Sequence, residues 1–270
     1  ISAFEQHLFE EEKSAATIGK YLRDVRCFYD FLERRPISKE ESITYKEHLT
    51  AEYAPASVNS MLAALNCFLR FIGRADACVK QLKIQRQIFS REDTQLTKAE
   101  YIRLCQTAER KHNRRLSLIL QTICGTGIRV SELQHITLEA VKRGKAVVSL
   151  KGKTRSVFVV HELQKKLLRY AAEQRILSGC IFVTRTGKPM SRTNIWREMK
   201  AVCTEAGVNP KKVFPHNLRH LFARIFYSME KDIAKLADIL GHSSINTTRI
   251  YIISTGAEHR RCMETMRLIL

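Results

Sequence analysis

The chain lacks the sequence features of membrane-spanning, exported and disulfide-stapled proteins. No apolar run approaches the ~18 residues that a membrane span needs, and no charged-then-apolar signal peptide opens the chain. The eight cysteines are scattered without a CxxC pair, which argues against a disulfide framework or a zinc site and favours free thiols in a reducing cytosol. Internal repeats and low-complexity segments are absent too. The first residue is Ile1 rather than Met, so we expect the natural start to lie upstream.

The composition is that of a folded and strongly basic protein. Apolar residues make up 44% of the 270 residues and charged residues 27%, which excludes a disordered or collagen-like chain and suits one large domain or two unequal ones. Lys+Arg number 46 against 27 Asp+Glu, a formal net charge of +19. Residues 1–89 hold 13 Lys+Arg and 12 Asp+Glu, and residues 90–270 hold 33 Lys+Arg and 15 Asp+Glu, so the excess positive charge belongs to the second part. This imbalance favours a polyanionic partner, most often nucleic acid, over a merely basic domain.

The first seventy-odd residues have the pattern of a small helical bundle. Capping residues predict helices that start near Thr17, Ser38 and Pro55. Apolar residues recur at helical spacing after the first and third of these, as expected for the core of a bundle. Further along, the periodicity lapses and the composition turns polar and basic. These patterns predict a helical domain over residues 1–75 and a linker over residues 76–93.

Residues 94–270 are predicted to form a second domain of helices around a short hairpin. A capping box at Thr97 opens its first helix, and Gly125 and Gly127 interrupt the next one. The hydrophobic period then changes to two, which predicts strands. The expected elements are helices at 116–124, at 130–136 and through 191–270, strands at 146–150, 156–160 and 181–183, and a basic hairpin tip at 151–155. The expected fold class is therefore mainly α with a small antiparallel β-sheet.

A glycine-containing turn in the second domain places an arginine where it could bind a phosphate. After Gly127, Arg129 lies at a helix start, with Glu132 one turn on. An arginine fork there can face a phosphate, and the start of the helix adds partial positive charge. Taken alone, the stretch favours an ordinary surface ion pair between Arg129 and Glu132 over a phosphate site.

Two later stretches add histidines, a second arginine and a tyrosine. His216, Arg219 and His220 share one face of a predicted helix that follows Pro215. No HExxH glutamate or third ligand accompanies the two histidines, so we expect no metal there. The third stretch, residues 240–251, is a glycine-containing turn that carries His242 and ends at a tyrosine, Tyr251. Taken singly, such histidines and tyrosines usually only satisfy hydrogen bonds in a core.

Together, these stretches resemble the tyrosine recombinase (phage-type integrase) family. The family pattern is an Arg in a TG-[IL]-R-x-S-E-L stretch, then H-x-L-R-H, then L-G-H-S followed by T-T-x-x-Y. All three occur here in order, at residues 126–133, 216–220 and 240–251, and the resemblance covers nearly the whole chain. It implies that residues 1–75 are a SAM-like core-binding domain that contacts DNA and that residues 94–270 are an α+β catalytic domain.

The resemblance implies reversible DNA cleavage without a metal, a cofactor or ATP. A tyrosine, Tyr251, would store the phosphodiester bond as a 3′-phosphotyrosyl link and free a 5′-hydroxyl. The resemblance also implies roles for six further residues. Arg129, Arg219 and His242 would bind the phosphate, and His216 would assist proton transfer at the tyrosine. Glu132 would orient the arginines, and Lys151 on the hairpin would be the general acid. Lys153 is the rival for the general acid, because it faces the same side if the strand continues.

Other residues bear on DNA contact, packing and assembly. Arg192, Arg197 and Lys200 are candidates for contacts to DNA bases. Leu221 and the residues after Tyr251 depart from the family pattern, which we interpret as packing variation. The chain ends in a predicted amphipathic helix over residues 257–270; in relatives such a tail docks on a neighbouring protomer, and packing within the same chain is the alternative.

The leading hypothesis is a site-specific recombinase or integrase that acts on double-stranded DNA with an inverted-repeat core site. It would work as a homotetramer through a Holliday junction, with accessory DNA-bending or directionality factors, in the bacterial cytoplasm. The strong charge and the cysteine content favour a mobile element, a phage or transposon, over chromosome-dimer resolution. The sequence leaves open whether an arm-binding domain lies upstream. The alternatives are a type IB-like topoisomerase, against which the helical N-terminal part argues, and a non-catalytic DNA-binding relative, against which the complete set of reactive residues argues.

Overall fold

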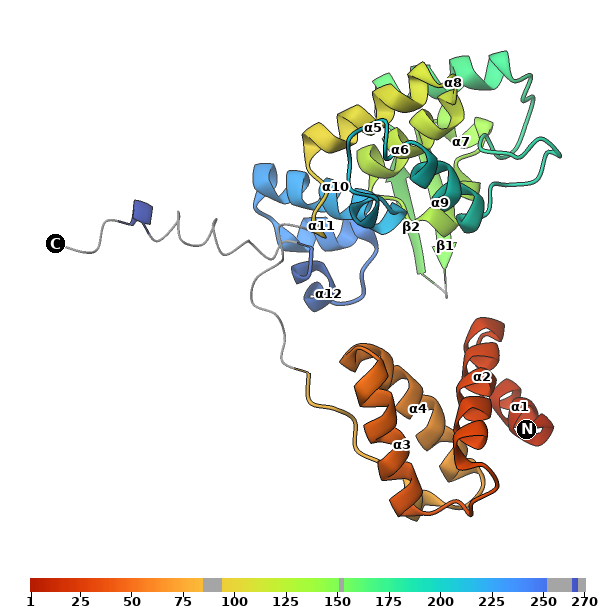
Figure 1. Cartoon of the computed structure of the whole chain (residues 1–270). Coiled ribbons are helices and arrows are strands. Elements are labelled where there is room, and N and C mark those ends of the chain that lie inside the picture. The colour runs from red at the N-terminus through yellow and green to blue at the C-terminus, as the bar shows by residue number, and fades with distance from the viewer. Residues whose placement is uncertain (85–93, 151–152, 252–263, 267–270) are drawn as a thin grey trace. The chain divides into compact units, whose positions relative to one another are not determined.

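The computed structural model describes residues 1–84, 94–150, 153–251 and 264–266 of the chain. The chain divides into two compact units, Ile1–Gln87 and Ile88–Leu270, drawn from red to orange and from yellow to blue in Figure 1. Most described elements are helices, accompanied by a two-stranded antiparallel sheet. The predicted fold class is confirmed.

Unit 1 is a helical bundle in which α1, α3 and α4 all pack against α2. Its elements are α1 (Ser2–Glu10), α2 (Ala15–Leu32), α3 (Lys39–Glu52), α4 (Pro55–Phe71) and the 3-10 turn η1 (Ala75–Ala77). The predicted start at Ser38 is confirmed, because its side chain accepts from the backbone N–H of Glu41, and Pro55 is the first residue of α4. The cap of α2 is Ser14 rather than Thr17, since the Ser14 hydroxyl accepts from the Thr17 backbone N–H.

Helix α1 is not one of the three helices that the capping residues predict. Phe4 and Leu8 lie one turn apart on it and are fully buried with Val25 of α2 and Phe68 of α4. The i, i+4 spacing of two apolar residues is the sequence signal that marks this helix.

The chain that follows η1 is attached to α4 through two asparagines. The Asn66 amide donates to the Val79 carbonyl (2.8 Å) and accepts from the Val79 N–H (2.9 Å). Asn59 forms the same pair of bonds with Leu82, at 2.9 and 2.7 Å. The described start of the expected linker is therefore fixed to the bundle, and residues 85–93 lie outside the described residues.

Unit 2 surrounds the sheet and a central helix, α6, with further helices. Its elements are α5 (Lys98–Arg110), α6 (Arg114–Thr126), η3 (Val130–His135), α7 (Leu138–Lys142), β1 (Lys145–Leu150), β2 (Lys153–Phe158), α8 (His161–Glu173), α9 (Arg192–Ala201), η4 (Pro210–Lys212), α10 (Pro215–Glu230), α11 (Ile233–Leu240) and α12 (Ile245–Arg249). The capping box at Thr97 is confirmed, with both reciprocal hydrogen bonds to Glu100. Helices α5, α8 and α10 pack on α6.

Two strand predictions need correction. The second strand starts at Lys153 and not at residue 156, so that Arg155 lies within β2, paired with Val148, and not in a hairpin tip. Residues 181–183 form no strand: within the described chain, this region contributes only isolated bridges, among them Val183 with Pro189. A charged side chain can point inward from a strand when a buried group of opposite charge pairs with it. The polarity of the residue alone does not reveal such a partner.

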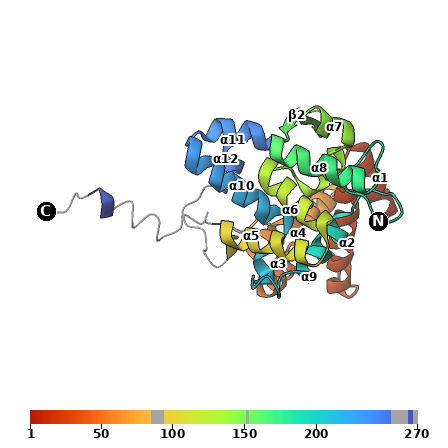
Figure 2. The ribbon, with the colours of Figure 1, turned by 90° about the horizontal axis from the view of Figure 1, so that it is seen from above.

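Gly125 does not interrupt α6, contrary to the sequence prediction. The helix continues to Thr126, and Gly127 alone ends it, in the left-handed conformation with φ of 64°. The segment that follows, η3, is a 3-10 helix. An added Cβ at Gly127 would lie 2.6 Å from Phe222 and 3.0 Å from Leu240, so Gly127 also lets α10 and α11 approach this turn. Figure 2 shows α10, α11 and α12 grouped together there.

The two glycines should respond oppositely to alanine. Gly127→Ala should lower the free energy of unfolding by at least about 2 kcal/mol, because a positive φ and an overlap with packed side chains combine. Gly125→Ala is the matched control: its Cβ would meet only Leu163 at 3.9 Å, and alanine in a helix should raise stability by about 0.5–1 kcal/mol.

Urea unfolding of both variants measures the difference. Equal losses at the two positions would contradict the continuous α6 and its end at Gly127.

Candidate active site

Helix α10 brings a buried arginine and two histidines to one face. Arg219 is 1% exposed, although its charge is costly to bury. Its Nη1 donates to the carbonyl of Gly127, and its Nη2 donates to the carbonyl of Leu240 at 2.6 Å. Burial and the charge of Arg129 lower the pKa of Arg219 to about 10, so it stays cationic at pH 7. Its Nε is buried and has no hydrogen-bond partner in the part of the chain that the structure describes.

The carboxyl end of α11 collects three arginines. The carbonyls of residues 239, 240 and 241 accept from Arg155 (2.8 Å), Arg219 (2.6 Å) and Arg129 (3.3 Å) in turn. The last carbonyls of a helix have no partner within it and carry the negative end of its dipole, so they suit guanidinium groups. Gly241 ends the helix with φ of 64°, and an added Cβ would overlap the side chain of Arg155. The glycine of the L-G-H stretch is thus needed both for the turn and for the arginine beside it.

Glu132 pairs with Arg129, the most exposed of these three arginines. Its carboxylate is 1% exposed and accepts from the backbone N–H of Arg129 (2.9 Å), from the Arg129 guanidinium (2.9 Å) and from Arg155 (2.5 Å). Burial alone would raise the pKa of Glu132, but the hydrogen bonds from Arg129 and the charge of Arg155 outweigh it and lower that pKa. Glu132 is therefore an anion between two cations. The sequence suggests a surface ion pair between Arg129 and Glu132, but the Glu132 carboxylate of that pair is buried.

His242 has a defined tautomer. Its Nε2 lies 3.0 Å from Nη2 of Arg219, and its Nδ1 lies 2.9 Å from Oγ1 of the buried Thr248. A guanidinium can only donate, so Nε2 accepts and Nδ1 carries the proton toward Thr248. Burial, together with the charges of Arg219 and Arg129, lowers the pKa of His242 to about 4, which keeps the ring neutral at pH 7.

Tyr251 lies among three histidine rings. Its hydroxyl is 3.4 Å from Nε2 of His216, and its ring stacks on His220 with centroids 4.1 Å apart. His242 lies 5.2 Å away, centroid to centroid. The backbone N–H of Tyr251 donates to the carbonyl of Thr248 at 2.9 Å, so the residue that orients His242 also holds the tyrosine. The tyrosine is 6% exposed.

The other two histidines are also kept neutral. Burial, with smaller contributions from His216 and Arg224, lowers the pKa of His220 to about 4. His216 keeps a solvent-exposed edge, and partial burial together with the charges of Arg219 and Arg129 lowers its pKa below the usual value. A neutral His216 beside a tyrosine hydroxyl can accept its proton.

The structure thus brings six of the predicted site residues together and leaves the lysines undecided. Those brought together are Arg129, Glu132, His216, Arg219, His242 and Tyr251. Lys151 lies outside the described residues, and of Lys153 only the backbone, paired with Leu150, is described. The predicted tail helix over residues 257–270 falls outside the described residues except for 264–266, and so does the question of how it docks.

The predicted DNA-reading residues lie on or beside α9. Arg192 and Arg197 are exposed, and the charge of Arg192 contributes to the lowered pKa of His216, which places it near the site. Lys200 donates to the carbonyl of Pro210 and lies 5.3 Å from the ring of Trp196, so it already has partners within unit 2.

Sequence reasoning assigned no role to Arg155, Thr248 and His220. Period-two alternation with the buried Val157 could have shown that Arg155 points inward. The sequence places His220 on the correct helix face, but its stacking on Tyr251 depends on where the chain after α12 packs against α10. Among the residues described, no group of three or more His, Cys, Asp or Glu side chains could hold a metal ion, and no helix is long and apolar enough to cross a membrane.

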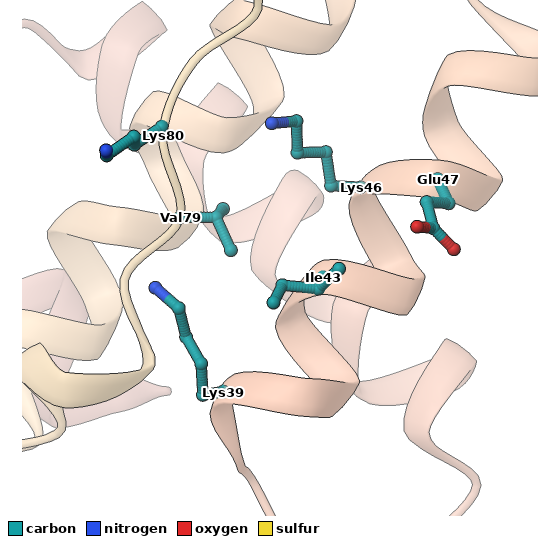
Figure 3. A pocket seen from close by; sticks show the side chains of 6 residues that line it. All are labelled: Lys39, Ile43, Lys46, Glu47, Val79 and Lys80. Atoms are coloured by element: carbon teal, nitrogen blue, oxygen red, sulfur yellow. The ribbon is translucent and has the colours of Figure 1, made fainter.

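Unit 1 has a hollow of its own with a cationic rim. A cavity of about 350 Å³ is lined by side chains of α3 and of the chain that follows η1: Lys39, Ile43, Lys46, Glu47, Val79 and Lys80. Figure 3 shows the three lysines around the apolar side chains of Ile43 and Val79. Lysines over an apolar floor suit a phosphate group.

Comparisons with known proteins match both parts of the chain. Residues 94–258 match the model of the "Phage integrase family", and residues 1–76 match "Phage integrase, N-terminal SAM-like domain". The chain is 30% identical over 281 residues to "Tyrosine recombinase XerA" of Thermococcus kodakarensis, covering 100% of this chain and 95% of that protein. It is 28% identical to "Tyrosine recombinase XerC" of Pediococcus pentosaceus, with 93% and 92% covered.

Solved structures of similar fold include DNA complexes. The fold is similar to that of a lambda integrase dimer bound to a COC′ core site, with a TM-score of 0.74 at 19% identity over 94% of both chains. It is also similar to the Tn1549 transposon integrase in complex with circular intermediate DNA, with a TM-score of 0.72 at 16% identity over 96% of both chains.

The neutral histidines predict a specific pH dependence of stability. The pKa values of His220 and His242 are about 4 in the folded chain, below the value near 6.5 in the unfolded chain. Between these two pH values the unfolded state therefore binds more protons. Stability that is present above pH 6.5 should therefore be lost as the pH falls toward about 4. Each histidine contributes a slope of at most about 1.4 kcal/mol per pH unit, reduced by solvent contact.

Urea unfolding at pH 7.5, 6.0 and 5.0 tests this dependence. The variant His220→Gln/His242→Gln should show a shallower fall in stability than the wild type over this range. An identical slope in the two proteins would contradict the assignment of neutral, buried rings.

Proposed function

The chain belongs to the phage integrase family of tyrosine recombinases, site-specific enzymes that cut and rejoin DNA, and on that premise we propose that Tyr251 is its nucleophile. The observation that carries this proposal is the position of the tyrosine hydroxyl, 3.4 Å from a neutral His216 and beside the buried Arg219. Tyr227 packs in the same small cluster as Tyr251, but within the described residues its hydroxyl makes no hydrogen bond to a histidine.

The proposed reaction conserves the number of phosphodiester bonds. The Tyr251 oxygen attacks the scissile phosphorus while the bond to the 5′-oxygen breaks, which leaves a 3′-phosphotyrosyl link and a 5′-hydroxyl. His216 accepts the phenolic proton, for which its lowered pKa keeps it free at neutral pH. A cationic lysine supplies the proton for the leaving 5′-oxygen, and we keep Lys151 for this role with Lys153 as its rival. Attack by the 5′-hydroxyl of another strand reverses the step and rejoins the DNA.

Arg129 and Arg219 are proposed to stabilise the charge on the non-bridging oxygens. Fixed guanidiniums in a partly buried site interact more strongly with developing charge than they would in water. Arg129 offers the more accessible face, with a side chain that is 36% exposed, whereas Arg219 is fixed by the carbonyls of Gly127 and Leu240. Glu132 would orient Arg129 without reacting.

His242 is proposed to change its hydrogen bonding when DNA binds. In the free protein its Nε2 accepts from Arg219 and therefore cannot donate to a phosphate. A phosphate anion beside the ring would raise its pKa, because a nearby negative charge favours the protonated form. The resulting imidazolium could donate to a phosphate oxygen while Thr248 still accepts from Nδ1.

The remaining features support DNA binding by both units. The excess of Lys+Arg in residues 90–270 would contact phosphates and give an affinity that falls steeply with salt. Unit 1 would add contacts as the core-binding domain, and the lysine-rimmed cavity at Lys39, Lys46 and Lys80 suits a DNA phosphate. We further propose assembly into a homotetramer on an inverted-repeat core site, strand exchange through a Holliday junction, and help from accessory factors.

The biological role has two candidates within the family. Integration of a mobile element is the first, and the similarity in fold to the Tn1549 transposon integrase supports it. Resolution of chromosome dimers is the second, and it is favoured by the end-to-end similarity to proteins named XerA and XerC. A type IB-like topoisomerase is disfavoured because the N-terminal SAM-like domain of integrases matches residues 1–76.

Trapping on DNA tests the nucleophile. Wild type, Tyr251→Phe and the control Tyr227→Phe are incubated with nicked, fragmented DNA of the source genome and denatured with SDS. Wild type and Tyr227→Phe should retain covalently bound DNA, whereas Tyr251→Phe should bind DNA but lose attachment by at least about 1,000-fold, because the attacking oxygen is gone. Attachment that persists in Tyr251→Phe would refute the proposal.

Sequencing the trapped DNA separates the biological roles. Discrete inverted-repeat sites at the ends of an integrated element would support the mobile-element role, and a single chromosomal site outside any element would support dimer resolution. Scattered attachment that depends on Tyr251 would favour a topoisomerase instead.

A further inference from the structure

Arg155 joins three separate segments around the site. It lies on β2 on the same face as the buried Val157, and its side chain is 12% exposed. Its Nη1 donates to the carbonyl of Ile239 at 2.8 Å, and its Nη2 donates to Oε2 of Glu132 at 2.5 Å. Its aliphatic stem lies against Gly241, where an added Cβ would overlap it. One side chain thus ties the hairpin, η3 and the end of α11 together.

Arg155 also limits how Glu132 can pair with Arg129. Oxygen Oε2 of Glu132 is shared by Arg155 and the backbone N–H of Arg129, which leaves only Oε1 for the guanidinium of Arg129, at 2.9 Å. Without Arg155, the carboxylate could pair with Arg129 through both oxygens, which is the strongest geometry available to the pair. Arg129 would then be turned toward Glu132, and its positive charge would be matched by that single carboxylate.

We propose that Arg155 is a positioning residue for strand transfer, which holds Glu132 and the end of α11 so that Arg129 keeps its charge and one guanidinium edge for the phosphate. The inference rests on the proposed function, since that assigns Arg129 to the phosphate. Arg155 itself is not assigned to the phosphate: its role in this account is to hold Glu132 and the carbonyl of Ile239.

The first test compares two arginines with the same kind of contacts. Arg115 donates from Nη1 to the carbonyl of Val183 (2.9 Å) and from Nη2 to Glu198 (2.6 Å), as Arg155 does with Ile239 and Glu132, but it lies at the opposite end of α6 from the site. Arg155→Met should slow covalent attachment to a nicked duplex carrying the trapped site by about 100-fold, with DNA affinity kept. Arg115→Met should lose a similar amount of stability and stay within about 5-fold of the wild-type rate. Equal rates in the two variants would overturn the proposal.

The second test separates a charge effect from a packing effect. In Arg155→Met/Glu132→Gln the neutral amide cannot capture the charge of Arg129, so attachment should be at least about 10-fold faster than in Arg155→Met alone. A merely structural role for Arg155 predicts that the double variant is as slow as the single one or slower, and that result would overturn the proposal. If Arg155→Met fails to fold, Arg155→Lys replaces it: lysine neutralises Glu132 but cannot span to Ile239, so a loss of about 10-fold is expected. A wild-type rate in Arg155→Lys would overturn the bridging role.

A measurement without DNA keeps this inference separate from the proposed function. In the wild type, the Arg129 guanidinium donates to one oxygen of Glu132 and to the carbonyl of Gly241. A crystal structure of Arg155→Met without DNA should show Arg129 paired with both oxygens of Glu132 and released from Gly241. If wild type never attaches to DNA, the proposed function fails, and this structure alone decides the inference: an Arg129 that keeps its wild-type contacts in Arg155→Met overturns it.

Discussion

The site depends on the carboxyl end of one short helix, α11. Three successive carbonyls there, of residues 239 to 241, accept from Arg155, Arg219 and Arg129. These oxygens have no partners within the helix and carry its negative end, so they hold cations without using up carboxylates. Glu132 pairs with two of these arginines, Arg129 and Arg155, so the three guanidiniums held at the helix end outweigh its single negative charge. A phosphodiester is the kind of group that such a site attracts.

The neighbouring histidines are neutral chiefly because their rings are buried. Burial removes the water that would stabilise an imidazolium, the nearby arginines oppose a second positive charge, and the pKa values of His220 and His242 fall to about 4. A neutral His216 beside the tyrosine can act as a base, and a neutral His242 can hold Arg219 until a phosphate arrives. Burial and the arginines together therefore keep the histidines around Tyr251 neutral, and the arginines also give the site its positive charge.

Much of this site could be predicted from the sequence, because its residues occur in short stretches with characteristic spacing. Gly127 and Gly241 each end a helix in the left-handed conformation. Arg219 donates to the carbonyl of Gly127 and to the carbonyl of Leu240, the residue before Gly241. The sequence did not reveal Arg155, since a basic residue within a predicted hairpin tip looks solvent-exposed until its buried partner is known. Likewise, Gly125 looks like a helix breaker, but packing of α6 among α5, α8 and α10 overrides that local preference. Tertiary partners decided both cases.

The central claim is that Tyr251 carries the cut DNA strand, and peptide mapping of the trapped complex tests it most directly. The SDS-denatured complex is digested with nuclease and trypsin, and tandem mass spectrometry locates the nucleotide adduct. The account predicts a 3′-phosphate ester on Tyr251, in the tryptic peptide that spans residues 250–260. An adduct on any other residue, or an adduct joined through a 5′-phosphate, would contradict the account.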